Sequence, residues 1–291
     1  MGMRMRDAFF QRLGELRYEP TEKRIRVLVG DHVVVDTTRA MLVWEPRRIV
    51  PSYAVPVAEL NGELVADAET SAADDRLLHP GVPFPVHSTP GASHTVKAGG
   101  TERPAAAFRP EDPDLADYAV LDFKAFDTWL EEDDRVVSHP RDPYHRIDVR
   151  PSSRHVRVEL NGELLAETSG PSLLFETSLP TRFYLPAEDL VASLRPSDKL
   201  TYCAYKGEAS YLSHDDLPNL AWCYRDPLPD AVQIKGMVAF YDDLVDVTVD
   251  GVLRERPDTV ISRTLVEEFK PGPAEDDRDP RNEERGGVGS I

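Results

Sequence analysis

Apolar and polar residues alternate in the same order in two parts of the chain. Residues 25–29 place apolar side chains at every second position, and a second apolar run follows a turn at 33–35. Residues 156–160 and 164–166 repeat this arrangement on either side of Asn161-Gly162. Asn-Gly between alternating apolar runs is the strongest short signal for a β-hairpin, because both turn positions need positive φ. The pattern therefore predicts a hairpin near the start of each part.

The similarity between the two parts extends well beyond these hairpins, in near-constant register. The recurring residues are Arg26-Val27 as Arg157-Val158, Asp36-Thr37 as Glu167-Thr168, Leu42–Glu45 as Leu173–Glu176, and, after one deletion, Tyr53, Pro56, Glu59 and Leu60 as Tyr184, Pro186, Asp189 and Leu190. Self-similarity over such a span predicts two copies of one fold. A functional site is then expected where one copy keeps chemistry that the other lacks.

The predicted architecture is all-β, with two tandem domains related by internal duplication. A short amphipathic helix is expected near the N-terminus, where Phe9-Phe10, Leu13 and Leu16 have helical spacing. The expected divisions are a lead-in at 1–22, a first copy at 23–150 with a long Pro/Gly/Ala-rich loop at 61–117, a second copy at 154–255, and an extension at 256–291 ending in a disordered acidic tail. Strands at 146–149 and 244–247 are expected to close the two copies.

Charge limits the classes of partner. The 52 acidic and 34 basic residues give a formal net charge of −18 over 291 residues. Such a chain repels nucleic acid and anionic membranes at long range, although a local basic pocket for a small anionic ligand is compatible with it. The two cysteines form no Cys-x-x-Cys pair, and no stretch resembles a signal peptide or a membrane span. A soluble, cytoplasmic protein is expected; the sequence leaves the oligomeric state open.

Several segments of the second copy, and the stretch that joins the copies, resemble a known family. They are Thr201–Tyr211, Ala221-Trp222, Asp226–Pro229, Val238–Tyr241 and the joining stretch His139–His145. Over about 24–251 they resemble the domain of unknown function numbered 427, and the two-copy form resembles an actinobacterial subgroup. The resemblance implies a β-tent fold, the architecture of methionine sulfoxide reductase B and of the thalidomide-binding domain of cereblon.

The resemblance implies no established reaction. Relatives in that fold class often bind zinc through paired Cys-x-x-Cys motifs, which this chain lacks. The family also carries a nucleotidyltransferase-like name, but no Gly-Ser turn followed by spaced aspartates is present. Two looser metal sets are present. Cys203, His214 and Cys223 lack the short chelating step of structural zinc sites. His79, His87 and His94 lie in a Pro/Gly-rich loop, a setting that exposes histidines without a metal. No metal or cofactor is expected.

The aromatic-rich part of the second copy is the leading site candidate. Aromatic rings with polar tips line many small-ligand pockets; here they are Tyr184, Tyr202, Tyr205, Trp222 and Tyr224. Among them Cys203 is a candidate nucleophile and Lys206 a cation that favours its thiolate. Glu176 is a candidate general base, while Arg182 and Lys206 are candidate anion contacts. The alternative is that the rings form the sheet core, with Cys203 buried as a small apolar residue.

Two further interpretations stay open. Both copies keep the glutamate, as Glu45 and Glu176, which favours a structural role such as satisfying buried backbone amides. The joining stretch is a rival site, because His139, Arg141, Asp142 and His145 are concentrated there; alternatively, its prolines fix a turn and Arg141 pairs with Asp142 at the surface.

The leading hypothesis is a second domain that binds a small organic ligand in an aromatic pocket, and the sequence leaves open whether it also acts on that ligand. The first copy's counterpart of 202–207 is 87–91, which contains neither cysteine nor lysine. The alternatives are a non-catalytic protein-interaction module and, from the family name alone, nucleotidyl transfer.

Overall fold

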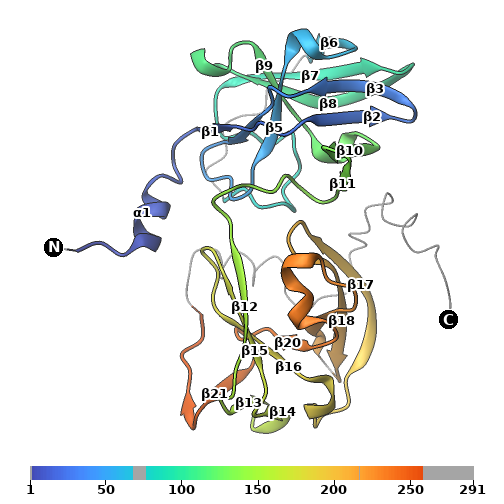
Figure 1. Ribbon diagram of the computed structural model, residues 1–291. Helices are drawn as coiled ribbons and strands as arrows, with labels where there is room; N and C mark the ends of the chain where they lie inside the picture. Colours follow the sequence, from blue (N-terminus) through green and yellow to red (C-terminus); the bar gives the residue numbers. More distant parts are fainter. Residues whose placement is uncertain (1, 68–76, 216, 258–291) are drawn as a thin grey trace. The chain divides into compact units, whose positions relative to one another are not determined.

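The computed structural model describes residues 2–67, 77–215 and 217–257. The chain divides into two compact units, which meet in sequence between Asp142 and Pro143 (Figure 1). Each unit consists mainly of antiparallel strands. None of the described helices is long and apolar enough to cross a membrane.

The first unit begins with a seven-residue helix, which is followed by eleven strands and three 3₁₀ turns. These elements are α1 (Met5–Gln11), β1 (Arg17–Pro20), β2 (Ile25–Val29), β3 (His32–Thr37), β4 (Met41–Trp44), β5 (Ser52–Pro56), η1 (Val57–Glu59), β6 (Glu63–Ala66), β7 (Gly91–Ala98), β8 (Thr101–Pro110), η2 (Pro113–Leu115), β9 (Tyr118–Leu121), η3 (Phe123–Ala125), β10 (Thr128–Glu131) and β11 (Asp134–Val136). They form a seven-stranded sheet, β1-β4-β5-β9-β8-β7-β6, and a four-stranded sheet, β11-β10-β2-β3.

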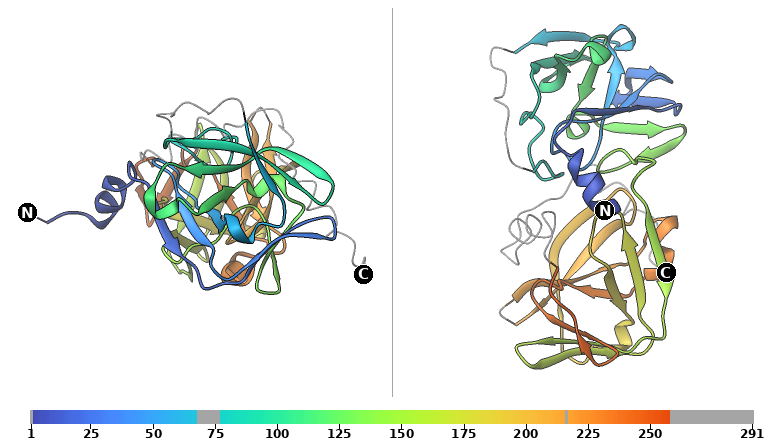
Figure 2. Two further views of the ribbon diagram at one scale, coloured as in Figure 1. Left: turned by 90° about the horizontal axis from the view of Figure 1, so that it is seen from above. Right: turned by 90° about the vertical axis from the view of Figure 1, so that its left-hand side faces the viewer.

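The second unit also has eleven described strands. Its elements are β12 (Ile147–Pro151), β13 (Val156–Leu160), β14 (Glu163–Thr168), β15 (Ser172–Glu176), β16 (Arg182–Leu185), η4 (Ala187–Asp189), β17 (Arg195–Cys203), β18 (Gly207–His214), β19 (Leu217–Tyr224), η5 (Pro229–Ile234), β20 (Val238–Phe240), β21 (Asp246–Val249) and β22 (Val252–Leu253). The sheets are β12-β15-β16-β20-β19-β18-β17 and β14-β13-β21-β22. Their strands belong to the part of the chain coloured from green to red in Figure 2.

The two units have the same strand topology. Adding eleven to each strand number of the first unit reproduces both sheets of the second, with every neighbour preserved. Most of the sequence similarities described above fall on strands that correspond under this rule, such as β4 and β15, and Glu59 and Asp189 fall in the equivalent 3₁₀ turns η1 and η4. The layout is that of a duplicated fold.

Three strands lie in the segment expected to be a long loop. Within 61–117, β6, β7 and β8 pair with one another, and β8 pairs with β9. Alanine, glycine and proline have low strand propensity, so composition conceals these strands; they form because partners are available on both sides. Among the described residues of this segment, 77–90 are the longest stretch outside the named strands.

The strand at 146–149 belongs to the second unit and does not close the first. It lies in β12, which pairs with β15 and so places Ile147 opposite Glu176. The first unit is closed by β10 and β11 instead. Alternation predicts that a strand exists, but it does not say which neighbour the strand will pair with.

The pairing also corrects the repeat register by one residue. Leu42 lies opposite Tyr53, whereas its equivalent Leu173 lies opposite Phe183. Tyr184 therefore occupies the position of Ala54. Because neighbouring strand residues point to opposite faces, Tyr53 and Tyr184 lie on opposite faces of equivalent sheets.

Each unit has a core on each face of its seven-stranded sheet. The larger core lies between the two sheets and includes Tyr53 in the first unit and Phe183 in the second. The other face carries a smaller core, which is formed by residues such as Phe108 in the first unit and Trp222 in the second. The aromatic residues that the sequence singled out lie mainly on this outer face of the second unit.

Candidate functional site

The outer face of the second unit's seven-stranded sheet carries aromatic side chains in adjacent rows. Tyr211, Trp222, Ala239 and Tyr184 follow one another across four strands, and Tyr224 lies opposite Ala209 in the next row. Side chains two residues apart on a strand share a face and are about 7 Å apart. These rings therefore form one continuous surface, which is also the second unit's smaller core.

The rings contact one another, and one hydrogen bond joins two of them. Tyr184 and Trp222 meet edge to face with ring centroids 6.4 Å apart, and Tyr184 lies at the same distance from Tyr224. Trp222 Nε1 donates to the Tyr184 hydroxyl at 3.1 Å. The cluster is thus packed as a core, as the alternative interpretation expected, and it has phenol groups within it.

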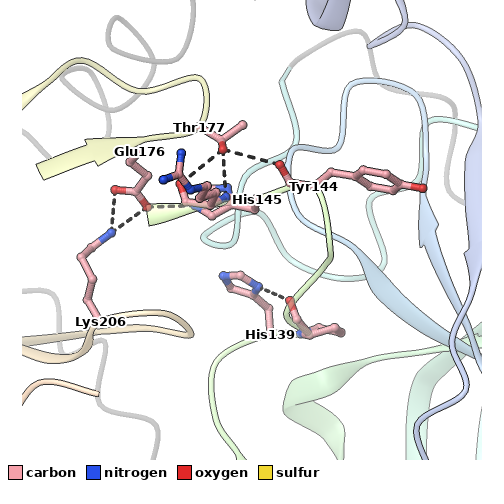
Figure 3. A network of polar contacts seen from close by, with 8 residues as sticks. His139, Tyr144, His145, Glu176, Thr177 and Lys206 are labelled. Atoms are coloured by element: carbon pink, nitrogen blue, oxygen red, sulfur yellow. Dashed lines mark hydrogen bonds and ion pairs between the residues drawn. The ribbon is translucent and has the colours of Figure 1, made fainter. Parts of the chain in front are cut away.

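A buried ion pair lies at the edge of this surface. Lys206 Nζ donates to both carboxylate oxygens of Glu176, at 2.7 and 2.6 Å (Figure 3). The side chains of Glu176 and Lys206 are only 6% and 10% exposed. Glu176 ends β15, and Lys206 lies in the three-residue turn between β17 and β18.

This ion pair joins strands that are not neighbours. Between β15 and β18 lie β16, β20 and β19. Because adjacent strands lie about 4.8 Å apart, a flat sheet would separate β15 from β18 by about 19 Å, which is more than two side chains span. The sheet must therefore curve toward its aromatic face.

The turn that carries Lys206 depends on a glycine. Gly207 has φ 92°, in the left-handed region, which only glycine adopts without strain. The Lys206 carbonyl accepts the backbone N–H of Leu228 at 3.0 Å. These two features hold the backbone so that the lysine side chain reaches Glu176.

His145 is the third member of the polar group. Its Nε2 lies 3.0 Å from Glu176 Oε1, and its ring lies 4.4 Å from that of Tyr205. The adjoining residues hold it there: the Thr177 backbone N–H donates to the Arg146 carbonyl, and the Thr177 hydroxyl oxygen accepts the Arg146 backbone N–H, next to the Ile147–Glu176 pair. Its side chain is 23% exposed, more than either partner. Solvent therefore reaches the group at His145.

The charges in this group are fixed. Burial alone would raise the pKa of Glu176, but the charge of Lys206 and the hydrogen bond to His145 lower it to about 2. Burial opposes the charge of Lys206, yet Glu176 raises the lysine pKa above its ordinary value. A carboxylate with so low a pKa is a poor general base near neutral pH. The electrostatics thus disfavour the proton-transfer role expected for Glu176.

The tyrosine hydroxyls stay protonated. Burial raises the pKa of Tyr184, and it raises that of Tyr224 well above the ordinary value. Both groups are therefore hydrogen-bond donors and not phenolates.

A family comparison covers most of these residues. A family model described as a domain of unknown function (DUF427) matches residues 17–75 and 148–251, more than half of the chain. The chain belongs to the DUF427 family. The second matched segment includes Glu176, Lys206 and the aromatic rows, whereas His145 lies just before it. No curated protein matches this DUF427 chain.

Arg182, a predicted anion contact, binds two carboxylates of this DUF427 chain. Its guanidinium binds Asp242 at 2.7 Å and Asp243 at 3.6 Å. The group also lies over the Trp222 ring, 5.7 Å from the centroid. The two carboxylates thus balance the charge of the guanidinium, and its role in holding an anion stays a prediction.

The other expected residues separate into those near the ion pair and those away from it. Tyr205 contacts His145, and Cys203 ends β17 on the same face as Thr201 and Tyr224. Tyr202 lies between Thr201 and Cys203, so its side chain points to the other face. Cys203 and Cys223 are partly buried and not disulfide-bonded.

The rival joining stretch is divided between the two units. His139, Arg141 and Asp142 belong to the first unit and His145 to the second. His139 Nδ1 lies 2.8 Å from the carbonyl oxygen of Pro140. Of this stretch, only His145 is described as part of the Glu176 group. The sequence gives no direct sign of the contact between His145 and Glu176. Assigning the strand at 146–149 as the partner of β15 would have indicated it.

Neither of the two looser metal sets, the cysteine–histidine set and the three-histidine set, forms a metal site in the part of the chain that the structure describes. No three His, Cys, Asp or Glu side chains gather there in an arrangement suited to a metal ion. His214 instead lies 3.4 Å from Glu163, and His94 Nδ1 lies 3.0 Å from the Ala92 carbonyl.

The first unit holds its equivalent glutamate with different partners. Glu45 Oε2 accepts the backbone N–H of Ser88 at 2.9 Å, and Oε1 lies 3.1 Å from both His87 and Arg48. Burial opposes ionisation of Glu45, but its hydrogen bond to His87 and the charge of Arg48 lower its pKa. His87 stacks on Phe108 with ring centroids 3.6 Å apart. Residues of the β6–β7 connection thus cover the first unit's outer face.

Proposed function

We propose that the second unit binds a small organic ligand at the margin of its aromatic face, beside Glu176, Lys206 and His145. The observation that carries the proposal is a permanently charged, buried ion pair that ends in a partly exposed imidazole. Buried charges are costly unless they are paired, and such arrangements concentrate at functional sites. The fixed charges favour binding and orienting a ligand over proton transfer by Glu176.

The contrast with the first unit supports the choice of the second. In the first unit, Phe84 and His87 of the β6–β7 connection pack against Phe108. The corresponding β17–β18 connection is only 204–206. In the second unit, η5 packs on the outer face instead, with Ala231 and Ile234 fully buried in its core, so the partly exposed place is the margin at His145.

A reaction at this site would need a different reactive group. Cys203 lies on the aromatic face and is close enough to Lys206 to contribute to the raised pKa of that lysine. Nucleophilic chemistry by Cys203 therefore stays a prediction, and Cys203→Ser would remove it while keeping the size of the side chain.

The two alternatives have weaker support. An interaction module needs a continuous apolar patch. The large apolar residues of the second unit that are exposed lie on several different elements: Tyr144, Phe175, Val191, Val232, Val252 and Leu253. For nucleotidyl transfer, the acidic residues of interest are Asp242 and Asp243, and both bind Arg182.

The finer architectural and cellular assignments are also proposals. The pairing of a seven-stranded with a four-stranded sheet in each unit is compatible with the β-tent fold that the family resemblance implies. The net charge of −18 and two cysteines without a disulfide favour the cytoplasm.

A thermal-shift screen tests the proposed function. Metabolite-sized compounds are screened against the full chain, since a bound ligand raises the melting temperature by mass action. Hits should lose their shift in His145→Ala and in Tyr205→Ala, and keep it in Tyr18→Ala, a matched ring deletion in the first unit. A screen without hits, or hits that ignore the His145 and Tyr205 variants, would contradict the proposal.

A further inference from the structure

Asp242, in the turn between β20 and β21, has one bound and one unbound carboxylate oxygen. Its Oδ1 accepts a hydrogen bond from Arg182 Nη1 at 2.7 Å. Its Oδ2 is buried and has no hydrogen-bond partner among the described residues. A buried acceptor left without a donor costs free energy comparable to a lost hydrogen bond. Asp242 is therefore able to hold a second cation without losing the first.

Arg254 lies on the solvent side of this free oxygen but does not reach it. Its Nη1 is 3.9 Å from Asp242 Oδ2, which is beyond hydrogen-bond range. Its guanidinium carbon lies 4.7 Å from the centroid of the Phe183 ring. The Arg254 side chain is 34% exposed and that of Asp242 is 7% exposed, so the arginine covers the aspartate. A ring face and a carboxylate oxygen are the two partners that a guanidinium group prefers.

The segment that carries Arg254 is weakly held. β22 pairs with β21 through only two residues, and both of its side chains are exposed. The Arg254 backbone N–H donates to the Val247 carbonyl at 2.9 Å. Arg256 donates to the Asp243 carbonyl at 3.3 Å and to the Asp246 carboxylate at 3.0 Å, where both side chains are about half exposed. Because exposed ion pairs contribute little, residues 252–256 can leave β21 at a small cost.

The first unit has different side chains at the equivalent positions. Val136 takes the place of Arg254 in the strand pairing and packs against the first unit's larger core. Ser52 takes the place of Arg182. A valine is thus sufficient to cover this edge of the fold, and the arginine is an addition of the second unit.

The charge that remains when residues 252–256 leave favours a cation. Asp242, Asp243 and Asp246 then face only the charge of Arg182. One free carboxylate oxygen beside a ring face suits a flat cation with several N–H donors. Calcium and magnesium, in contrast, need several oxygen ligands at once.

We propose that Asp242 and Phe183 form a guanidinium-binding site that Arg254 covers in the free chain. The ligand is an arginine side chain of a peptide or a free guanidino compound, and it takes the place of Arg254 when residues 252–256 leave β21. Without the backbone bond that holds Arg254, the ligand approaches Asp242 Oδ2 to hydrogen-bond distance while it stacks on Phe183. This site is separate from the one proposed at Glu176, Lys206 and His145 and does not depend on it.

Removal of the resident arginine tests the inference. The probes are N-acetyl-arginine methylamide, which represents a peptide arginine, and agmatine, which represents a free guanidino compound. They are titrated into the full chain by calorimetry or ligand-observed NMR. Arg254→Ala should bind one of them at least tenfold more tightly than wild type, because the Arg254 side chain no longer competes. The tighter of the two probes assigns the source of the guanidinium group, and no gain with either would overturn the inference.

A neutral probe and a control variant show whether the gain belongs to this site. N-acetyl-citrulline methylamide has the shape of the arginine probe without its charge and should not bind Arg254→Ala. Arg150 binds Asp148, which also binds Arg146, so Arg150→Ala frees a carboxylate at the surface and should gain no affinity. Binding of the citrulline probe, or an equal gain in Arg150→Ala, would contradict the proposed site.

A further variant tests the ring face and leaves the contact between Asp242 and Arg182 intact. Arg254→Met keeps a long side chain over Phe183 but has no charge, so it should gain less affinity than Arg254→Ala. If the two variants gain equally, the probe binds away from Phe183 and the inference is wrong.

Discussion

Glu45 and Glu176 occupy equivalent positions in the two units and are ionised by different means. Glu45 accepts a backbone N–H from Ser88 and lies against His87 and Arg48, which are all buried. Glu176 binds Lys206 from a short turn and His145 from the segment before β12, and His145 is partly exposed. The carboxylate is kept while its partners change, which indicates that the fold needs it. What differs is access, because solvent reaches only the second group among the contacts described.

The largest expected effect comes from removing the cation of the second unit. Lys206→Met leaves the Glu176 carboxylate buried without its ion-pair partner, so the free energy of unfolding should fall by about 3–5 kcal/mol. Urea unfolding followed by tryptophan fluorescence measures this, with Lys97→Met as the matched control. Lys97 pairs with Glu102 at the surface, where such a pair contributes about 0–1 kcal/mol.

The double variant Glu176→Gln/Lys206→Met separates the cost of an unpaired charge from the value of the pair. Because it removes both charges, it should recover most of the stability that Lys206→Met loses. If both variants are equally unstable, the side-chain packing of Lys206 is responsible and not its charge.

Acid should weaken the second unit's ion pair in a defined pH range. The pKa of Glu176 is about 2 in the folded chain against an ordinary value of 4.5. A carboxyl with a lowered folded-state pKa contributes stability that is fully present above pH 4.5 and is lost as the pH falls through about 2, here about 3 kcal/mol. The unfolding free energy of wild type, measured relative to that of the double variant, should therefore fall by about 3 kcal/mol between pH 5 and pH 2. A constant difference would mean that Glu176 is not held ionised.

A smaller effect is expected for Glu45→Gln in the first unit. The amide oxygen can still accept the Ser88 N–H, but the ion pair with Arg48 is lost, so stability should fall by about 1–3 kcal/mol. Chemical unfolding is again the measurement, and Glu102→Gln at the surface is the control. If Glu45→Gln loses as much stability as Lys206→Met, the hydrogen bond from the Ser88 N–H does not make the first unit less dependent on the charge of its glutamate.

The sequence predicts the duplication and the family from local similarity, but it does not predict which residues meet. The hairpin signals at 25–35 and 156–166 are local, and the structure has strands there. The Glu176–Lys206 contact crosses three intervening strands and leaves no spacing signal. The glutamate present in both copies indicates that the position matters, but it does not identify the residue that binds the carboxylate.

The register error has a similar cause. The sequence alignment places the deletion after Tyr53 and so matches Tyr184 with Tyr53, whereas the pairing of β16 with β20 matches Tyr184 with Ala54. A shift of one residue moves a strand side chain to the opposite face. The sequence therefore concealed that the second unit has Tyr184, Tyr211 and Tyr224 where the first has Ala54, Ser93 and Pro110.

The smallest expected effect on stability distinguishes these added tyrosines from one another. Tyr224→Phe removes a hydroxyl that bonds no described residue, so the free energy of unfolding should change by less than about 0.5 kcal/mol. Tyr184→Phe removes the acceptor of the Trp222 indole N–H and should cost about 1–3 kcal/mol. Parallel urea titrations measure both. If Tyr224→Phe loses as much stability as Tyr184→Phe, the Tyr224 hydroxyl stabilises the fold. The contrast between a structural outer face in the first unit and a ligand-binding one in the second would then lose one of its supports.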